Sequence, residues 1–304
     1  MNHPVALPTP ADASRGLWLG LLGVLIFAMT LPMTRVAVGS TEAPQLAPLF
    51  VTAGRAALAG LLSVAWLLVV RPRAPRGAQW QQLAVCAAGT VLGFPLLLGL
   101  ALREVDAMHA AVITGVLPLG TAIAAAIHFR QRPSAGFWAC ALLGCALVLV
   151  FAAVRGSGRL VAADGLLLLA VACASIGYVA GARLSADLGA ETAICWVLAA
   201  SLPATLPVAL AILPAQPVSA AAWGGFLYVS LFSMWIGFFA WYRGLALGGT
   251  VRVSQVQLVQ PFLSLLFAVP VAGERLDAST IAFSLAVIAT VVVGKRLPID
   301  TRPT

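Results

Sequence analysis

The sequence predicts an all-α integral membrane protein in which ten transmembrane helices form two inverted repeats of five helices. Three observations lead to this prediction. The chain is 61% hydrophobic and only 9% charged, whereas a soluble domain carries about 25% charged residues. Apolar runs of roughly 20 residues, the length that crosses a bilayer, use most of the chain. One helix-length stretch with an internal proline occurs twice, around Pro118 and around Pro261, which indicates a duplicated protein.

The apolar runs define ten expected spans, because their lengths and flanking charges match helices that cross a membrane. They lie at about 16–38, 46–70, 80–102, 107–128, 134–154, 163–185, 191–213, 220–243, 250–272 and 279–296. The runs show no two-residue alternation, so helices are expected rather than a barrel. The expected parts of the chain are a disordered N-terminal tail at 1–15, a first five-helix repeat at 16–154, a linker at 155–162, a second five-helix repeat at 163–296 and a C-terminal tail at 297–304.

The Lys and Arg residues indicate how the spans are oriented. With the N-terminus inside, the inner segments hold twelve of these residues and the outer segments five, while Arg55 lies inside the second span. This excess predicts that both termini lie in the cytoplasm. Because each repeat has an odd number of spans, the second repeat enters the membrane from the opposite side. Inverted repeats are typical of secondary transporters, whose binding site lies between the repeats near the midplane of the membrane.

The duplicated stretch locates a polar stripe on one helix of each repeat. An offset of 143 residues pairs Thr114 with Gln257, Pro118 with Pro261, and Thr121 with Ser264. Within each helix these positions lie at i, i+4 and i+7, so they share one face. Each proline leaves a carbonyl of the preceding turn in need of a neighbour, water or substrate. Alternatively, the hydroxyls bond back to their own helices and the prolines only kink them.

Aromatic residues supply the other candidates for the binding site. Aligning the first spans of the two repeats on Arg35 and Arg183 sets Phe27 and Thr30 opposite Ser175 and Tyr178. An aromatic ring beside a small hydroxyl suits a ligand with an apolar body and a polar handle, although helix packing explains Phe27 equally well. Spans three and eight share a Gly-Phe pair that ends in Phe94 and Phe238. Trp235 lies deep in span eight, where its indole N–H needs an acceptor.

The complete set of candidate substrate-binding residues is Thr30, Phe94, Thr114, Pro118, Ser175, Tyr178, Trp235, Phe238, Gln257 and Gln260. The hydrogen-bonding groups expected in the cavity are Thr30, Thr114 and Gln257. Its apolar or stacking walls are expected to be Phe94, Tyr178 and Trp235.

Two ionisable side chains inside spans are candidates for gating or charge recognition. Arg55 lies about ten residues into span two, at a depth where a charge usually faces protein or a water-filled cavity. It either attracts a substrate anion or forms a gate, or it snorkels or pairs with Glu42 or with carbonyls. His109 lies just inside span four and either titrates near neutral pH or is a solvated interfacial residue. All Asp and Glu residues map to span ends or loops, so no buried carboxylate proton relay is predicted.

Several classes of function lack their residues in this sequence. It contains no GxSxG, P-loop or HExxH motif, and its five cysteines lie in apolar runs without a CxxC pair. We therefore expect no catalytic residue, no cofactor and no metal site. The net charge of +8 comes from basic residues in ones, twos and threes between spans. Because this is the pattern of topology determinants, nucleic-acid binding is not expected.

The ten spans, the five-plus-five duplication and the segment PFLSLLFAVPVAGERLD at 261–277 together resemble the EamA-type permeases of the drug/metabolite transporter superfamily. The resemblance covers Gly16 to Arg296, and Gln131 replaces the acidic residue of the first copy. Arg55 falls where this family commonly has an arginine in the second span. The resemblance implies an inner-membrane permease with alternating access and a central cavity built from spans one, three, four, six, eight and nine.

The expected function is that of a secondary transporter that moves a small metabolite across the inner membrane by alternating access. Relatives export amino acids or other small metabolites, so amino-acid export is the first candidate. The expected partners are a small-molecule substrate and the lipid bilayer, and the expected oligomeric state is a monomer. The alternative is a membrane-embedded enzyme, or a lipid-handling or assembly protein, without solute transport. An enzyme would need clustered acids or histidines at one membrane face, and none is evident.

Overall fold

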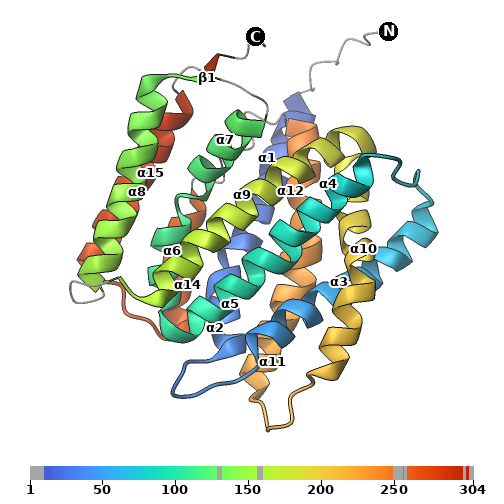
Figure 1. Ribbon diagram of the computed structural model, residues 1–304, viewed down its shortest axis with the longest axis horizontal. Helices are drawn as coiled ribbons and strands as arrows, with labels where there is room; N and C mark the ends of the chain where they lie inside the picture. The colour runs from blue at the N-terminus through green and yellow to red at the C-terminus, as the bar shows by residue number, and fades with distance from the viewer. Residues whose placement is uncertain are drawn as a thin grey trace.

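The computed structural model describes residues 10–128, 132–155, 160–248, 256, 259–296 and 299–300 (Figure 1). The first half of the chain contains α1 (Pro10–Ala28), α2 (Thr30–Val38), α3 (Pro48–Val70), α4 (Gln79–Cys86), the π-helix η1 (Ala87–Gly93), α5 (Phe94–Glu104), α6 (Ala107–Thr114), α7 (Leu117–His128), β1 (Arg132–Pro133) and α8 (Ala135–Arg155). The second contains α9 (Ala162–Leu188), α10 (Ala190–Ala211), α11 (Ala220–Leu227), the π-helix η2 (Tyr228–Ile236), α12 (Gly237–Gly248), α14 (Gln260–Ala272), α15 (Ala278–Arg296) and β2 (Ile299–Asp300).

The fold is that of a multi-pass membrane protein. Consecutive helices continue one another, and within the described residues eight of the resulting helical segments are long and apolar enough to cross a membrane. They run over 14–38, 48–70, 79–104, 107–128, 135–154, 162–188, 190–211 and 220–244. These segments correspond to the first eight expected spans. The ninth and tenth correspond to shorter apolar helices, Gln260–Ala272 and Ala278–Val293, and the expected start of the ninth lies outside the described residues.

Both tails differ from the expectation at their described residues. Helix α1 begins at Pro10, within the segment expected to be disordered. Proline is favoured at the first helical position because its missing N–H would have no partner there, and Asp12 in the first turn complements the helix dipole. At the other end, Ile299 and Asp300 form an antiparallel pair with Pro133 and Arg132, so two short strands accompany the predicted helices.

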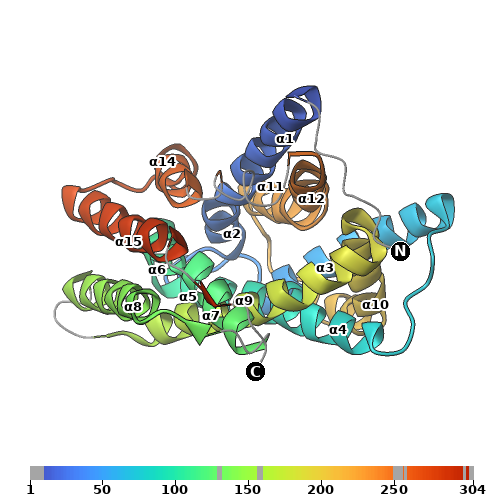
Figure 2. The same ribbon diagram turned by 90° about the horizontal axis from the view of Figure 1, so that it is seen from above.

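Helices from the two halves of the chain pack in pairs. Helix α1 lies along α12, α3 along α10, and α8 along α15, while α4, η1 and α5 lie along α9 and α6 contacts α14. Figures 1 and 2 show these pairs side by side from two directions. The start of α1 and the end of α15 both lie at the upper end of the molecule in Figure 1. The two halves are therefore interleaved rather than separate domains.

Prolines interrupt two of the membrane-length segments. Pro32 has no N–H to donate to the carbonyl of Ala28, four residues earlier, and the helix breaks between α1 and α2 at Met29. The Ala28 carbonyl instead accepts a hydrogen bond from Ser264 Oγ of α14, at 2.9 Å. Pro118 stands in the same relation to Thr114, and the second break separates α6 from α7. Both breaks leave backbone polar groups that neighbouring helices or a cavity can satisfy.

The two π-helices occupy matching places at a Gly-Phe pair: η1 ends on Gly93, and η2 ends on the residue before Gly237. A Cβ atom at Gly93 would lie 2.7 Å from the carbonyl oxygen of Ala88, and one at Gly237 would lie 2.9 Å from that of Phe232. In both cases the carbonyl belongs to the residue five positions earlier, which the wide turn of a π-helix brings close. Glycine is required at the end of each π-helix for this reason.

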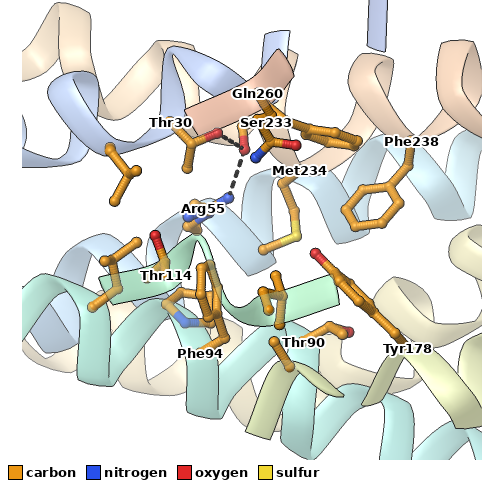
Figure 3. A pocket seen from close by; sticks show the side chains of 16 residues that line it. Thr30, Arg55, Thr90, Phe94, Thr114, Tyr178, Ser233, Met234, Phe238 and Gln260 are labelled. Carbon is orange, nitrogen blue, oxygen red and sulfur yellow. Dashed lines mark hydrogen bonds between the residues drawn. The ribbon is translucent and has the colours of Figure 1, made fainter. Parts of the chain in front are cut away.

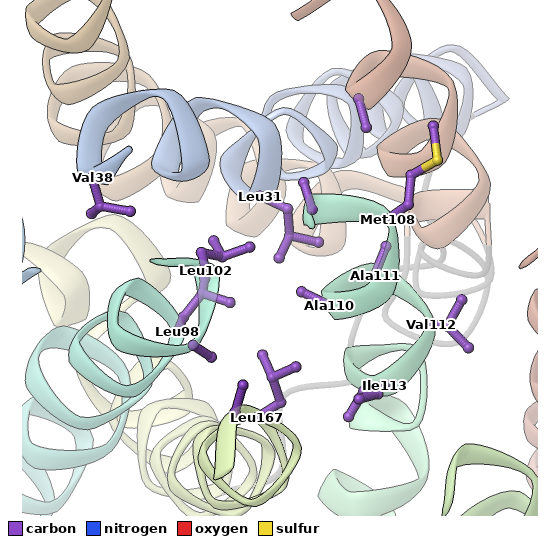
Figure 4. Close-up of a cluster of buried hydrophobic side chains, with 14 of the residues drawn as sticks. Leu31, Val38, Leu98, Leu102, Met108, Ala110, Ala111, Val112, Ile113 and Leu167 are labelled. Atoms are coloured by element: carbon purple, nitrogen blue, oxygen red, sulfur yellow. The ribbon is translucent and has the colours of Figure 1, made fainter. Parts of the chain in front are cut away.

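A cluster of buried apolar side chains, drawn from close by in Figure 4, joins helices toward the lower end of the molecule in Figure 1. It joins α2, α5, α6 and α9, among other elements, through residues that include Leu31, Leu98, Leu102, Met108 and Leu167. Leu102, Ile113 and Leu167 are fully buried. The cluster closes this end of the helix bundle.

Candidate functional site

A cavity lies between the two halves of the chain, with about 700 Å³ of atom-free space including its opening. Residues of the first half that line it are Phe27, Thr30, Leu31, Arg55, Thr90, Phe94, Pro95, Leu98, Thr114 and Leu117. Residues of the second half are Ala174, Tyr178, Ser233, Met234, Phe238 and Gln260. Figure 3 shows that side chains from both halves face one another across the same space. Leu31 and Leu98 belong also to the apolar cluster, so this cluster forms the floor of the cavity.

Arg55 forms the polar centre of the cavity together with two hydroxyls. Its side chain comes from α3 and is only 4% exposed. Arg55 Nη2 donates to Ser233 Oγ at 3.1 Å, and Ser233 Oγ lies 2.8 Å from Thr30 Oγ1, as drawn in Figure 3. Arg55 Nε is buried without a hydrogen-bond partner. None of the described lining residues is acidic, so the guanidinium charge has no counter-charge in the cavity.

The other polar groups of the cavity present mainly acceptor atoms. Thr114 Oγ1 donates to the Ala110 carbonyl at 2.7 Å, and Thr90 Oγ1 donates to the Cys86 carbonyl at 2.7 Å. A hydroxyl has only one proton to donate, so these oxygens can only accept from a ligand. Gln260 contributes a side-chain oxygen that is buried without a partner. Pro118 leaves the Thr114 carbonyl without its usual donor at this site.

Apolar side chains form the remaining wall. Phe27 and Phe238 contact each other edge to face, with ring centroids 5.1 Å apart. Phe94 and Met234 extend toward the cavity in Figure 3, and Tyr178 approaches from α9 on the side of Phe238. A pocket with a few polar groups and an aromatic wall suits a small amphiphilic molecule.

Seven of the residues named from the sequence line this cavity. They are Thr30, Arg55, Phe94, Thr114, Tyr178, Phe238 and Gln260. Pro118 lies next to it, in a smaller pocket that also touches Thr114 and Gln260. Gln257 lies outside the described residues, as does Gln131.

The structure places Trp235, Ser175 and His109 away from the cavity. Trp235 Nε1 donates to Ser63 Oγ at 3.2 Å, and its ring packs on Phe239 at 4.7 Å. Ser175 is buried beside an apolar groove on another face of the molecule, lined from α4, α7, α8 and α9. His109 lies at the lower end of the bundle, in contact with Asp164.

The cavity residues that were not candidates from the sequence include Thr90, Ser233 and Met234. Ser233 and Met234 come from η2, where the wide helical turn changes which side chains point inward. The sequence did offer one signal for Ser233, which is a hydroxyl in the middle of the aromatic span. A hydroxyl in an apolar environment needs a hydrogen-bond partner.

Known proteins with similar sequences identify the family. The EamA-like transporter family matches residues 14–153 and, a second time, residues 161–294. The chain belongs to the EamA-like transporter family. A protein of Bacillus subtilis (strain 168) named "Uncharacterized transporter YdeK" is 41% identical over 282 residues, which cover 92% of this chain and 96% of the relative. The family expected from the duplicated proline and Gly-Glu-Arg pattern is thereby confirmed.

A solved structure shares the fold of this EamA protein. It superimposes with a TM-score of 0.62 at 18% sequence identity, over 92% of this chain and 96% of the other chain. Its title, "Crystal structure of protein", names no substrate. The likeness therefore extends to the arrangement of the helices.

The lower end of the EamA protein holds a buried acid–histidine pair. His109 Nε2 of α6 lies 2.7 Å from Asp164 Oδ1 of α9, with side-chain exposures of only 7% and 3%. Asp164 also accepts a hydrogen bond from the backbone N–H of Val161 at the start of α9. The His109 ring lies 5.2 Å from that of Phe151. The expectation that His109 is solvated at the interface is wrong, because α8 and α9 cover it.

Glu274, in the loop between α14 and α15, forms hydrogen bonds with the start of α6. Its carboxylate accepts hydrogen bonds from the backbone N–H groups of Ala107 at 2.6 Å and Met108 at 2.8 Å. These are unpaired donors at a helix N-terminus, where a negative charge is favourable. Burial raises the pKa of Glu274, while the two backbone donors and the charge of Arg35 act in the opposite direction. Glu274 thus joins the loop between α14 and α15 to α6 directly below the cavity.

Proposed function

We propose that this protein is a secondary transporter that moves a small metabolite across the inner membrane by alternating access, with amino-acid export as the first candidate activity. The observation that carries the proposal is one cavity lined by both halves of the chain, with an uncompensated arginine and an aromatic wall. A scaffold or assembly protein has no need of such a site. Family membership and the relative named as a transporter support the same conclusion.

The proposed architecture is ten spans in two inverted five-helix repeats, at 16–154 and 163–296, with both termini in the cytoplasm. The pairing of α3 with α10 and of α8 with α15 supports it, because these are equivalent spans of the two matched regions. Figure 1 draws each of these pairs with its members running in opposite directions. In such a fold the two repeats rock about the central site to expose it to one side at a time.

The proposed transport pathway runs from the upper end of the molecule in Figure 1 to the lower end. The apolar cluster around Leu31, Leu98 and Leu102 acts as the outer gate. Opening it requires α6 to move relative to α2 and α5. We assign the hydrogen bonds of Glu274 to the start of α6 and the His109–Asp164 pair to the same gate.

Flux measurements in proteoliposomes test the proposed function. The purified protein is reconstituted, and uptake of a panel of labelled amino acids and other small metabolites is compared with uptake by empty vesicles. Phe94→Ala removes a cavity wall, so we expect about a tenfold loss of flux for any substrate that stacks there. Trp18→Ala is the matched control, because this aromatic residue of α1 is 69% exposed and lies outside the cavity. If a folded protein transports no panel member above the empty vesicles, the proposal is wrong.

A further inference from the structure

We propose that the cavity selects a substrate with a net negative charge, a carboxylate attached to an apolar body, and that Arg55 binds this carboxylate. The inference rests on the proposed function, because it concerns the substrate of the same cavity. The proposed substrate differs from an amino acid because it needs no ammonium group.

The charge balance of the cavity carries the proposal. Arg55 is fully ionised at any physiological pH, lies within α3 and is 4% exposed. A buried charge in a membrane segment is costly unless it is paired. No acidic residue lines the described cavity, and among the described residues no carboxylate forms an ion pair with Arg55. A ligand with one net negative charge neutralises the site, whereas a zwitterion leaves one positive charge uncompensated.

The geometry around Arg55 suits a carboxylate. One guanidinium nitrogen, Nη2, is engaged by Ser233 Oγ at 3.1 Å. Nε is buried without a partner. A guanidinium binds a carboxylate through two parallel N–H donors, so the Nε–H is the donor still available for one of these bonds. Ser233 in turn lies 2.8 Å from Thr30 Oγ1, which holds the guanidinium side of the site in place.

The rest of the cavity suits an uncharged remainder of the ligand. The oxygens of Thr90 and Thr114 have committed their protons to their own helices, so they accept from a neutral donor such as a ligand hydroxyl. An ammonium group would find these two oxygens, the Gln260 side-chain oxygen and the Tyr178 hydroxyl, all of them neutral, and no carboxylate among the described lining residues. Phe94, Met234 and Phe238 provide an apolar surface opposite Arg55 (Figure 3). The preferred ligand therefore has an anionic end and an aliphatic or aromatic body.

Three probes with the same phenylethyl body separate the possible charge requirements. They are 3-phenylpropionate with only a carboxylate, L-phenylalanine with both charged groups, and phenethylamine with only an ammonium group. Binding to the full-length protein in detergent is measured by thermal shift and by isothermal titration. We expect 3-phenylpropionate to bind most tightly and phenethylamine to bind at least about tenfold more weakly, the order of effect of losing a charged hydrogen bond. In proteoliposomes, 3-phenylpropionate should also compete for flux.

Variants of Arg55 test whether this residue causes the preference for a carboxylate. Arg55→Gln should weaken 3-phenylpropionate binding at least about tenfold and remove the preference over phenethylamine, while Arg55→Lys should retain part of it. Arg73→Gln is the matched control, because Arg73 is exposed in the loop between α3 and α4. The comparison of the three probes on the unmodified protein decides the proposal even if Arg55→Gln does not fold.

The outcomes distinguish this proposal from the proposed function. If L-phenylalanine binds more tightly than 3-phenylpropionate, or phenethylamine binds as well, the carboxylate site is wrong. Flux of L-phenylalanine without binding of 3-phenylpropionate would leave amino-acid transport in place and overturn only this proposal. If none of the three probes binds to the folded protein, the proposal is also overturned, whereas the metabolite panel decides the transport function independently.

Discussion

The indole of Trp235 fixes η2 against α3 outside the cavity lining. Its N–H donates to Ser63 Oγ at 3.2 Å, and the Ser63 side chain is completely buried. Because Ser63 is shielded from water, the bond contributes to stability rather than to recognition of a substrate. Two residues earlier in η2, Ser233 contacts Arg55. Trp235 and Ser233 therefore join η2 to α3 through two separate hydrogen bonds.

We predict that Trp235→Phe lowers the free energy of unfolding by about 1 kcal/mol, the usual net value of one buried hydrogen bond, and leaves substrate affinity unchanged. The phenyl ring keeps the contact with Phe239 but cannot donate a hydrogen bond to Ser63. Thermal unfolding in detergent and flux in proteoliposomes are the two measurements. Trp18→Phe, at an exposed position of α1, should change neither. A loss of flux at unchanged stability would show that the indole contacts the substrate after all.

Arg55 and Trp235 illustrate what the sequence can predict about single residues. Arg55 was expected to face protein or a cavity, because lipid cannot accommodate a charge at that depth. Trp235 and Phe238 lie three positions apart, so a regular α-helix would set them on one face. The π-helix η2 ends between them, and its wider turn rotates Phe238 into the cavity while Trp235 faces α3. Residue patterns do not reveal such an insertion, and Ser233 was missed for the same reason.

At the scale of the elements, the loop between α14 and α15 controls the position of α6. Helix α6 is short, and its first backbone N–H groups depend on Glu274 for their hydrogen bonds. Its other end stops at the break before Pro118, beside Arg55 and the cavity. Movement of the loop is thereby linked to movement of Thr114 at the cavity.

We predict that the stability contributed by Glu274 depends on pH. Burial is the main cause that raises its pKa, with the nearby charge of Asp106 adding to it, so the folded protein binds the proton more tightly than the unfolded chain. This contribution is complete below the pKa of an unfolded glutamate and is lost as pH rises through the higher folded-state pKa. Relative to Glu274→Gln, which cannot ionise, the unmodified protein should therefore lose stability with rising pH.

Thermal unfolding of both proteins across pH 4–8 measures this difference, since all other titrating groups cancel in the comparison. Glu42→Gln is the control, because Glu42 is an exposed carboxylate at the same end of the molecule, and it should show no such trend. A gain in stability of the unmodified protein with rising pH would mean that the donors on α6 outweigh burial.

The positions of helices and helix breaks could be predicted from the sequence where a single physical rule determines them. Run length located eight membrane-length helices within a few residues, and Pro118 marks the break between α6 and α7. The break at Met29 was not foreseen, although Pro32 removes the same type of hydrogen bond as Pro118. The contact of Glu274 with α6 joins positions 166 or 167 residues apart, and no local pattern encodes it.

At the scale of the whole molecule, the two family matches cover nearly all of the chain, and equivalent spans pack against each other. Such pairing is expected of repeats related by a two-fold axis. Helix α3 meets α10 and α8 meets α15, so each of these helices contacts its own counterpart. Duplication could be predicted from the repeated proline stretch, and the odd number of spans per repeat then implies inversion. The side of the membrane on which each end lies depends on the Lys and Arg distribution.

Equivalent loops of inverted repeats must lie on opposite sides of the membrane, which gives the last prediction. Arg73 lies in the loop after α3, Gln216 lies in the corresponding loop after α10, and both are exposed. A membrane-impermeant maleimide should label Gln216→Cys in intact cells but label Arg73→Cys only after permeabilisation, with the unmodified protein as background for the native cysteines. Labelling of both on one side would refute inversion. If Arg73→Cys alone reacts in intact cells, inversion stands and the orientation is reversed, because the twelve-to-five excess of basic residues would then face outward.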